Sequence, residues 1–155
     1  MKHLDLIKSD FRNFLFIAWK HLALPPPTPI QYDIAEYLQG GPKRLIIQAF
    51  RGVGKSWITS AFVVWKLLCD PQLKFLVISA SKQRSDDFST FTKRIIQEMP
   101  ILQHLRARED QRNSNVAFDV ARVVNSGIIC FELPGRCSYW KDPLVMQFMT
   151  EFMLL

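Results

Sequence analysis

Apolar residues recur along the 155-residue chain with two kinds of spacing, which separate predicted helices from predicted strands. Intervals of three and four residues are typical of helices with one buried side, and they occur over 3–22, 29–38, 55–69 and 83–99, with a further turn over 101–105. Short, nearly continuous apolar runs are typical of buried strands, and they occur over 44–49, 74–80, 116–120 and 123–133. The chain is therefore predicted to alternate strands with helices.

The order of these elements predicts the fold class. A strand over 44–49, a helix over 55–69 and a second strand over 74–80 make a β–α–β unit, whose two strands are parallel and joined by a right-handed crossover. We therefore expect an α/β fold in which a parallel sheet is flanked by helices.

The N-terminal segment, residues 1–28, is predicted to be a helix followed by a stiff connector. The run Pro25-Pro26-Pro27 ends the helix, and Thr28 and Pro29 begin the next one, with Gln31 three residues after Thr28 as in a capping box. The apolar side of the first helix is wide. This helix either packs against the flank of the domain or provides a contact surface for another subunit or protein.

The loop after the first predicted strand carries the most specific chemistry in the chain. Residues 49–56 match the phosphate-binding P-loop pattern G-x-x-x-x-G-K-[ST], except that an alanine replaces the first glycine. Two glycines let the backbone turn its N–H groups toward a phosphate, and the following helix adds the positive end of its dipole. The predicted nucleotide site consists of Ala49, Phe50, Arg51, Gly52, Val53, Gly54, Lys55 and Ser56.

Individual side chains of this site have predicted roles. Lys55 reaches the β- and γ-phosphates, Ser56 is a ligand for Mg²⁺, and Arg51 stabilises charge on the transferring phosphoryl group, so Arg51 and Lys55 are the candidate catalytic residues. The predicted cofactors are ATP and Mg²⁺. Lys82 and Arg84 follow the second strand of the unit, at the sheet edge where ligands of open α/β sheets bind. They are candidates to contact DNA, a neighbouring subunit or phosphate, or else are solvated side chains.

Composition adds weaker evidence. The chain has 20 Lys and Arg against 14 Asp and Glu, and the net charge of +6 is compatible with a nucleic-acid partner, although the charges are spread out. The three cysteines form no C-x-x-C pair and no even set, which favours a reducing compartment. No secretory signal is evident and no apolar run is long enough to span a bilayer, so we expect a soluble, intracellular protein.

A carboxylate that would complete ATP hydrolysis is missing from the sequence. P-loop hydrolysis needs an Asp that holds Mg²⁺ at the end of another strand, in an apolar run followed by Asp-Glu or Asp-Asp. The nearest match, Ile128-Ile129-Cys130-Phe131-Glu132, has a glutamate without the preceding Asp. Glu132 is therefore interpreted as an ordinary residue at a strand end, and we expect negligible hydrolysis by the chain alone.

Several of these segments together resemble the large terminase subunit, or DNA maturase B, of short-tailed bacteriophages. The segments that carry the resemblance are Phe14–Trp19, Pro27–Pro29, Gln31, Ala49–Ser56, Ala61–Trp65, Asp70–Lys74 and Ser79–Lys82. The similarity extends over about residues 10–120. Ala49 and Arg51 within the P-loop indicate a terminase rather than a generic ATPase.

The resemblance implies a fold, a function and a set of partners. It implies a helicase-like, additional-strand P-loop ATPase domain over 29–120 that drives double-stranded viral DNA into a procapsid through the portal. It implies that Gln31 contacts the adenine edge, whereas the residues alone leave a capping role equally open. The implied partners are the portal and procapsid, the small terminase subunit and further copies in a ring, without a membrane, and the implied location is the host cytoplasm.

The resemblance also has gaps. Family members continue with a Walker B strand that ends in acidic residues and with a nuclease domain whose carboxylates bind metal, and neither occurs here. We hypothesise that residues 121–155 are a divergent tail of a truncated, frame-shifted or split reading frame, which leaves open whether the chain is an enzyme. Two alternatives stand beside this reading: a fragment of a helicase or other DNA-dependent ATPase, and a non-enzymatic DNA- or protein-binding module with a vestigial P-loop.

Overall fold

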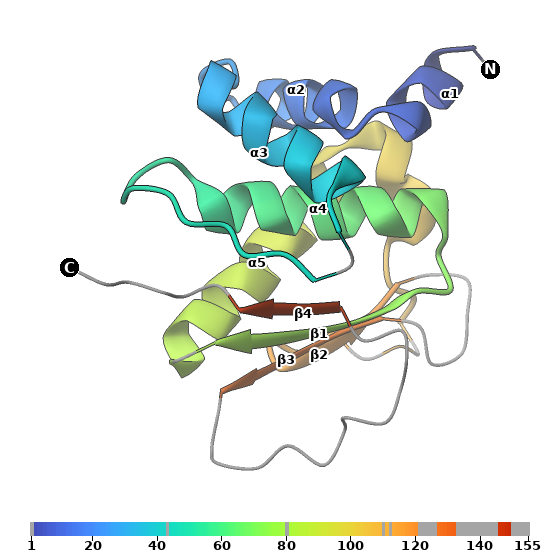
Figure 1. Ribbon diagram of the computed structural model, residues 1–155. Helices are drawn as coiled ribbons and strands as arrows, with labels where there is room; N and C mark the ends of the chain where they lie inside the picture. The colour runs from blue at the N-terminus through green and yellow to red at the C-terminus, as the bar shows by residue number, and fades with distance from the viewer. Residues whose placement is uncertain are drawn as a thin grey trace.

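The chain is arranged in three layers, with a β-sheet, two long helices against it and three N-terminal helices on the outside (Figure 1). This computed structural model describes residues 2–42, 44–79, 81–109, 111, 113–120, 127–132 and 146–149. The helices are α1 (Lys2–Ser9), α2 (Phe11–His21), α3 (Pro29–Gly40), α4 (Lys55–Cys69), α5 (Lys82–Glu98) and the 3₁₀ helix η1 (Pro100–Leu105). The strands are β1 (Lys74–Ser79), β2 (Ala117–Asp119), β3 (Gly127–Glu132) and β4 (Met146–Met149).

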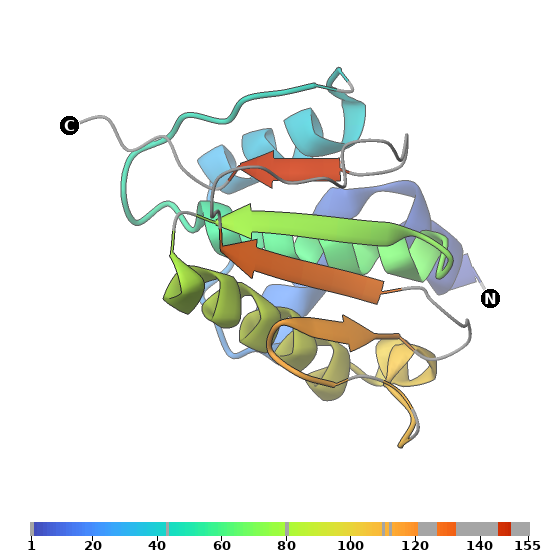
Figure 2. The same ribbon diagram turned by 90° about the horizontal axis from the view of Figure 1, so that it is seen from below.

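The sheet is built around β1 and β3, which are parallel from Lys74 opposite Gly127 to Ser79 opposite Glu132. β4 pairs in parallel with the other edge of β1, and β2 is antiparallel to β3, so the strand order is β2-β3-β1-β4. The described helices lie on one face of this sheet, as Figures 1 and 2 show together, whereas we expected helices to flank it. The coarser prediction, helices combined with parallel strands, agrees with the structure.

Helix α4 is enclosed by other elements along most of its length. It lies between the N-terminal helices on one side and α5 and the sheet on the other (Figure 1), and its predicted range of 55–69 is confirmed. Its buried residues are Ile58, Thr59, Ser60, Ala61, Phe62, Val63, Val64, Trp65, Leu67 and Leu68. A helix that is apolar on all sides has to be surrounded by protein. α4 is therefore the centre of the hydrophobic core.

An aromatic cluster joins α4 to the N-terminal helices. The ring centroid of Phe62 lies 5.1 Å from that of Phe11, edge to face, and 5.7 Å from that of Trp65. The Trp65 indole Nε1–H donates to the Ile7 carbonyl at 2.9 Å, so the polar atom of this buried ring has a partner. These contacts hold α1 and α2 against α4.

The single helix predicted over 3–22 is wrong, because the chain breaks at Asp10 into α1 and α2. Asp10 has an extended backbone with φ −137°, and its carboxylate accepts a hydrogen bond from the Arg12 N–H at 2.9 Å, which caps α2. The Arg12 guanidinium also pairs with this carboxylate at 2.9 Å. The hydrogen-bonded pair lowers the pKa of Asp10 below its ordinary value of 3.8.

The strand predicted over 44–49 is also wrong, since no strand is formed there. Leu45, Ile47 and Ala49 are partly buried against the core, while Ile46 between them is 76% exposed. The segment is thus extended, with one side turned inward. Both edges of β1 are already paired, with β3 and β4, so neither is available to this segment. The apolar run correctly predicted burial, but a strand also needs a partner.

The remaining predicted elements are present among the described residues. The helix over 83–99 is α5, the turn over 101–105 is η1, and the strands over 74–80, 116–120 and 123–133 are β1, β2 and β3. Most of the predicted tail, 121–155, lies outside the described residues, which in that range are those of β3 and β4.

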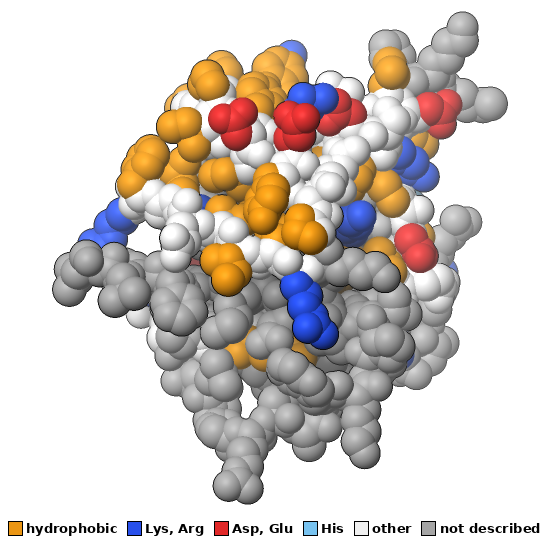
Figure 3. All heavy atoms as spheres, viewed as in Figure 1, with side chains coloured by type: hydrophobic (Ala, Val, Ile, Leu, Met, Phe, Trp, Pro, Cys, Tyr) orange, Lys and Arg blue, Asp and Glu red, His pale blue; other side chains and the backbone are white. Residues whose placement is uncertain are grey.

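Apolar side chains are both buried and exposed on the N-terminal helices. α2 packs inward with Phe11, Phe14, Leu15, Ala18 and Trp19, which supports packing against the domain as the role of this segment. Its outer residue Phe16 is 47% exposed. In Figure 3 hydrophobic side chains lie beside acidic ones on this side of the molecule. None of the helices described has the length and apolar character that a membrane crossing requires.

Replacement of Phe62 by alanine should lower the free energy of unfolding by about 3–5 kcal/mol, because it leaves a cavity in place of a fully buried ring. Phe16→Ala is the matched control, since it removes a half-exposed ring from α2 and should have a much smaller effect. Urea denaturation of both variants, followed by circular dichroism, measures the difference. Equal losses would contradict the assignment of the α2–α4 contact as the core.

The Asp10–Arg12 pair should make stability depend on pH. Asp10→Asn keeps a helix-capping side chain but removes the charge. Because the folded-state pKa of Asp10 is lowered, its contribution is present above pH 3.8 and is lost as the pH falls through the lowered pKa. We expect the variant to be less stable than the unmodified chain at pH 7, and the difference to shrink as the pH falls below 3.8. A difference in unfolding midpoint that does not vary with pH would contradict this.

Candidate functional site

The loop of residues 50–54 has a backbone conformation that glycine makes accessible. Gly52 has φ +93° and Gly54 has φ +85°, in the left-handed region that disfavours other residues. Gly54 is the N-cap of α4, and its carbonyl accepts the first helical hydrogen bond, from Ile58 N–H at 3.0 Å. The two predicted glycines of the P-loop pattern therefore stand at the two left-handed positions of the loop.

Backbone N–H groups without a described backbone acceptor lie where this loop meets α4. Within the part of the chain that the structure describes, no backbone carbonyl accepts a hydrogen bond from the N–H of Gly52, Gly54, Lys55 or Ser56. The first N–H groups of any α-helix lack intrahelical partners, and the helix dipole adds positive potential there. The arrangement can bind an anion through successive backbone N–H groups.

The Lys55 side chain folds back over the loop. Its ammonium donates to the carbonyls of Ala49 at 2.6 Å and of Phe50 at 3.1 Å. These bonds hold the ammonium close to the backbone of residues 49–50. A bound phosphate would offer the same ammonium charged oxygen acceptors, which form stronger hydrogen bonds than neutral carbonyls do.

Other residues of the predicted site lie at the surface of the loop and helix end. Arg51 and Phe50 are exposed, and so is Ser56 in the first turn of α4. Val53 is buried and anchors the loop to the core. The Ser56 hydroxyl at the helix N-terminus fits a Mg²⁺ ligand, because Mg²⁺ commonly takes one or two protein oxygens together with phosphate and water. Among the described residues, no cluster of three His, Cys, Asp or Glu side chains forms a metal site by itself.

Gln31 is brought to the loop from α3. Its side-chain carbonyl accepts from Thr28 N–H at 3.0 Å, one half of the predicted capping box, and its Nε2 donates to the Val53 carbonyl at 2.8 Å. The structure thus brings Gln31 into contact with the loop before α4 and forms the hydrogen bond from Thr28 N–H that a capping box requires, whereas the predicted adenine contact stays a prediction. Sequence reasoning missed the hydrogen bond to Val53, because no local pattern indicates which carbonyl a glutamine side chain will meet.

An aromatic pair of one exposed and one partly buried ring adjoins the site. Trp57, the residue after Ser56, stacks on Phe91 of α5 with ring centroids 5.3 Å apart and an angle of 17° between the ring planes. This contact links the start of α4 to α5. Sequence reasoning missed this contact as well, because the only indication of it was an apolar residue directly after the P-loop motif.

Lys82 and Arg84 lie in the first turn of α5, directly after β1, and both are exposed. The Ser81 hydroxyl caps this helix by accepting from Arg84 N–H at 3.4 Å. Glu132 ends β3, in register with Ser79 at the end of β1. The carboxyl ends of β1 and β3 and the start of α4 lie at the same end of the molecule (Figures 1 and 2). The phosphate-binding loop predicted from the sequence, the basic residues Lys82 and Arg84, and Glu132 are therefore all at this end of the sheet.

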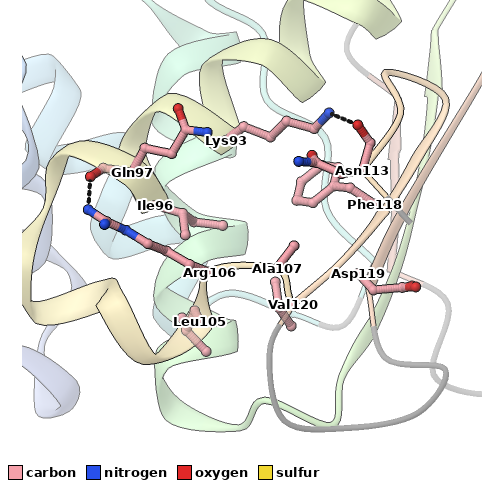
Figure 4. A pocket seen from close by; sticks show the side chains of 10 residues that line it. All are labelled: Lys93, Ile96, Gln97, Leu105, Arg106, Ala107, Asn113, Phe118, Asp119 and Val120. Carbon is pink, nitrogen blue, oxygen red and sulfur yellow. Dashed lines mark hydrogen bonds between the residues drawn. The ribbon is translucent and has the colours of Figure 1, made fainter. Parts of the chain in front are cut away.

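A separate cavity of about 400 Å³ lies elsewhere, between α5, η1 and β2 (Figure 4). Lys93 from α5 donates to the carbonyls of Asn113 at 3.2 Å and Ser114 at 2.8 Å, and its ammonium stands 5.2 Å from the centre of the Phe118 ring. Arg106 donates to the Gln97 carbonyl. No predicted site residue lines this cavity.

No protein-family model matches the chain. The chain is similar to the terminase large subunit of Enterobacteria phage T3, with 54% identity over 115 residues, which are 74% of this chain. The chain spans about one fifth of that relative's length. The predicted resemblance to the large subunit of phage terminases is therefore confirmed, over a segment of such a subunit.

Proposed function

We propose that this chain is the ATP-binding segment of a viral DNA-packaging motor, in which the loop of residues 49–56 holds the phosphates of ATP. The observation that carries the proposal is the loop before α4, which has two left-handed glycines, backbone N–H groups without a described backbone acceptor, and the Lys55 ammonium held at its start. Anion binding at a helix N-terminus by a glycine-rich loop followed by Lys and Ser is the chemistry of P-loop nucleotide sites. The identity to a terminase large subunit supports DNA packaging as its setting.

The residues around the loop have distinct proposed roles. Lys55 would contact the β- and γ-phosphates, Ser56 would hold Mg²⁺, and the exposed Arg51 would stabilise charge on the terminal phosphate. The fold proposed for this site is the helicase-like P-loop ATPase with an additional strand. Mg²⁺, which the Ser56 hydroxyl would help to hold, would supply neutralisation of phosphate charge.

Partners are proposed on the same basis. Lys82 and Arg84, exposed at the edge next to the loop, would contact double-stranded DNA phosphates or a neighbouring subunit of a ring. Other proposed partners are the portal and procapsid and the small terminase subunit, in the host cytoplasm. These follow from the resemblance to a terminase large subunit, of which the chain spans about one fifth.

Lys55→Met should weaken the binding of ATP with Mg²⁺ by about 10- to 100-fold, because it removes a charged hydrogen-bond donor to phosphate. Isothermal titration of the purified chain with ATP and Mg²⁺ measures the affinity. Lys66→Met is the matched control, since Lys66 lies further along α4, with its ammonium 5.1 Å from the Trp65 ring centre. Binding in this control should be unchanged. Absence of ATP binding by the unmodified chain would favour a binding module with a vestigial loop.

We expect the chain alone to release phosphate from ATP at a negligible rate. The sequence has no Asp-Glu or Asp-Asp pair after an apolar run, and Glu132 at the end of β3 is the nearest carboxylate of this kind. Steady-state phosphate release should stay at background and should be the same for Glu132→Gln. Robust turnover that Glu132→Gln abolishes would show that Glu132 is a catalytic carboxylate and would contradict the expectation.

A further inference from the structure

The side-chain amide of Gln31 connects three parts of the chain. It belongs to α3, its carbonyl oxygen accepts from Thr28 N–H, and its Nε2 donates to the Val53 carbonyl. A backbone N–H can only donate and a backbone carbonyl can only accept, so the two partners determine which way the amide points. The start of α3 is thereby tied to the loop before α4.

The hydrogen bond to Val53 determines the orientation of one peptide group in the loop. No cis peptide bond occurs in the described chain, so the Val53 carbonyl and the Gly54 N–H point in opposite directions from their shared peptide plane. Gly54 has φ +85° and Gly52 has φ +93°, so glycine offers little steric resistance to a flip of the peptides between them. An external contact is needed to hold one orientation.

We propose that Gln31 is a positioning residue of the phosphate loop. By holding the Val53 carbonyl on the α3 side, it directs the Gly54 N–H to the opposite side, where Lys55 and the start of α4 provide the other donors. Loss of this contact would let the peptide turn and present a carbonyl oxygen, which repels phosphate. This inference rests on the proposed function, and it adds a role that needs no contact between Gln31 and the nucleotide.

The residues around Gln31 hold its side chain in place. Gln31 can therefore act as a brace, meaning a contact that keeps the loop in one conformation. α3 is held to the core by Ile34, Ala35 and Leu38, which are buried. The space between Gln31 and the loop is tight, because a Cβ added at Gly54 would come within 3.3 Å of the Gln31 Nε2. The amide position is therefore set by packing on the α3 side and by close contact on the loop side.

A base contact by Gln31 is a separate role, and a ligand without a base distinguishes the two. A primary amide has two N–H donors and two acceptor lone pairs, so Gln31 keeps one N–H and one lone pair after both observed bonds. A contact to adenine would affect ATP alone. A brace would affect every ligand held by the loop, including inorganic tripolyphosphate.

The test measures binding of ATP and of tripolyphosphate, each with Mg²⁺, by isothermal titration of the full chain. Gln31→Ala removes the brace, while Gln31→Glu keeps an acceptor for Thr28 N–H and removes the donor to Val53. Both variants should bind both ligands about tenfold more weakly, the loss expected for one hydrogen bond. Melting temperatures of all variants establish that they are folded.

Gln39→Ala is the matched control for structural damage. Gln39 lies on the same helix, and its side chain also makes two bonds to the backbone, from Phe11 N–H at 2.7 Å and to the Ser9 carbonyl at 3.0 Å. Its removal should lower the melting temperature as Gln31→Ala does, yet leave the affinity for both ligands unchanged.

Each outcome decides between the roles. Weaker binding of both ligands by the two Gln31 variants, with unchanged binding by Gln39→Ala, supports the brace. Loss of ATP affinity with unchanged tripolyphosphate affinity overturns it and identifies a base contact. Equal losses in Gln39→Ala overturn it as well, because they trace the effect to general destabilisation. If the unmodified chain binds neither ligand, the proposed function fails, and the brace fails with it.

Discussion

Burial of α4 on nearly all sides is the constraint on which the rest of the structure depends. An apolar helix needs protein around its whole circumference, and here α1, α2 and α3 cover one side while α5 and the sheet cover the other (Figure 1). Because the helix is immobilised along its length, its first turn has a defined place. That turn carries Lys55 and Ser56, so the packing of the core determines where the candidate phosphate donors stand.

Elements whose boundaries are encoded locally could be predicted from the sequence. Asp70-Pro71 ends α4 and Pro100 ends α5, and both helices were predicted within a residue of their observed limits. The break at Asp10 was not predicted, since apolar residues continue at helical spacing through it and only the competing cap divides the helix. The segment over 44–49 failed for a different reason, because strand formation depends on pairing with a remote partner.

In the candidate site, too, locally encoded features could be predicted and contacts between remote residues could not. The loop pattern contains its own glycines, lysine and serine, so the positions of the left-handed residues followed from local sequence. Lys55 bonding to the carbonyls of Ala49 and Phe50, Trp57 stacking on Phe91, and Gln31 reaching Val53 are tertiary contacts. Their partners lie between five and 34 residues apart along the chain, and no spacing rule connects them.

Two side chains thus form hydrogen bonds to the loop, one from a residue that precedes it in the sequence and one from the residue that follows it. Lys55 binds carbonyls at the beginning of the loop, and Gln31 binds a carbonyl near its end. The Lys55 bonds are exchangeable, since phosphate oxygens are better acceptors for an ammonium. The Gln31 bond joins the side-chain amide to the carbonyl of Val53, whose side chain is buried, so it ties α3 to the anchored part of the loop. A ligand would therefore displace the lysine and leave the glutamine in place, which makes α3 part of the site's framework.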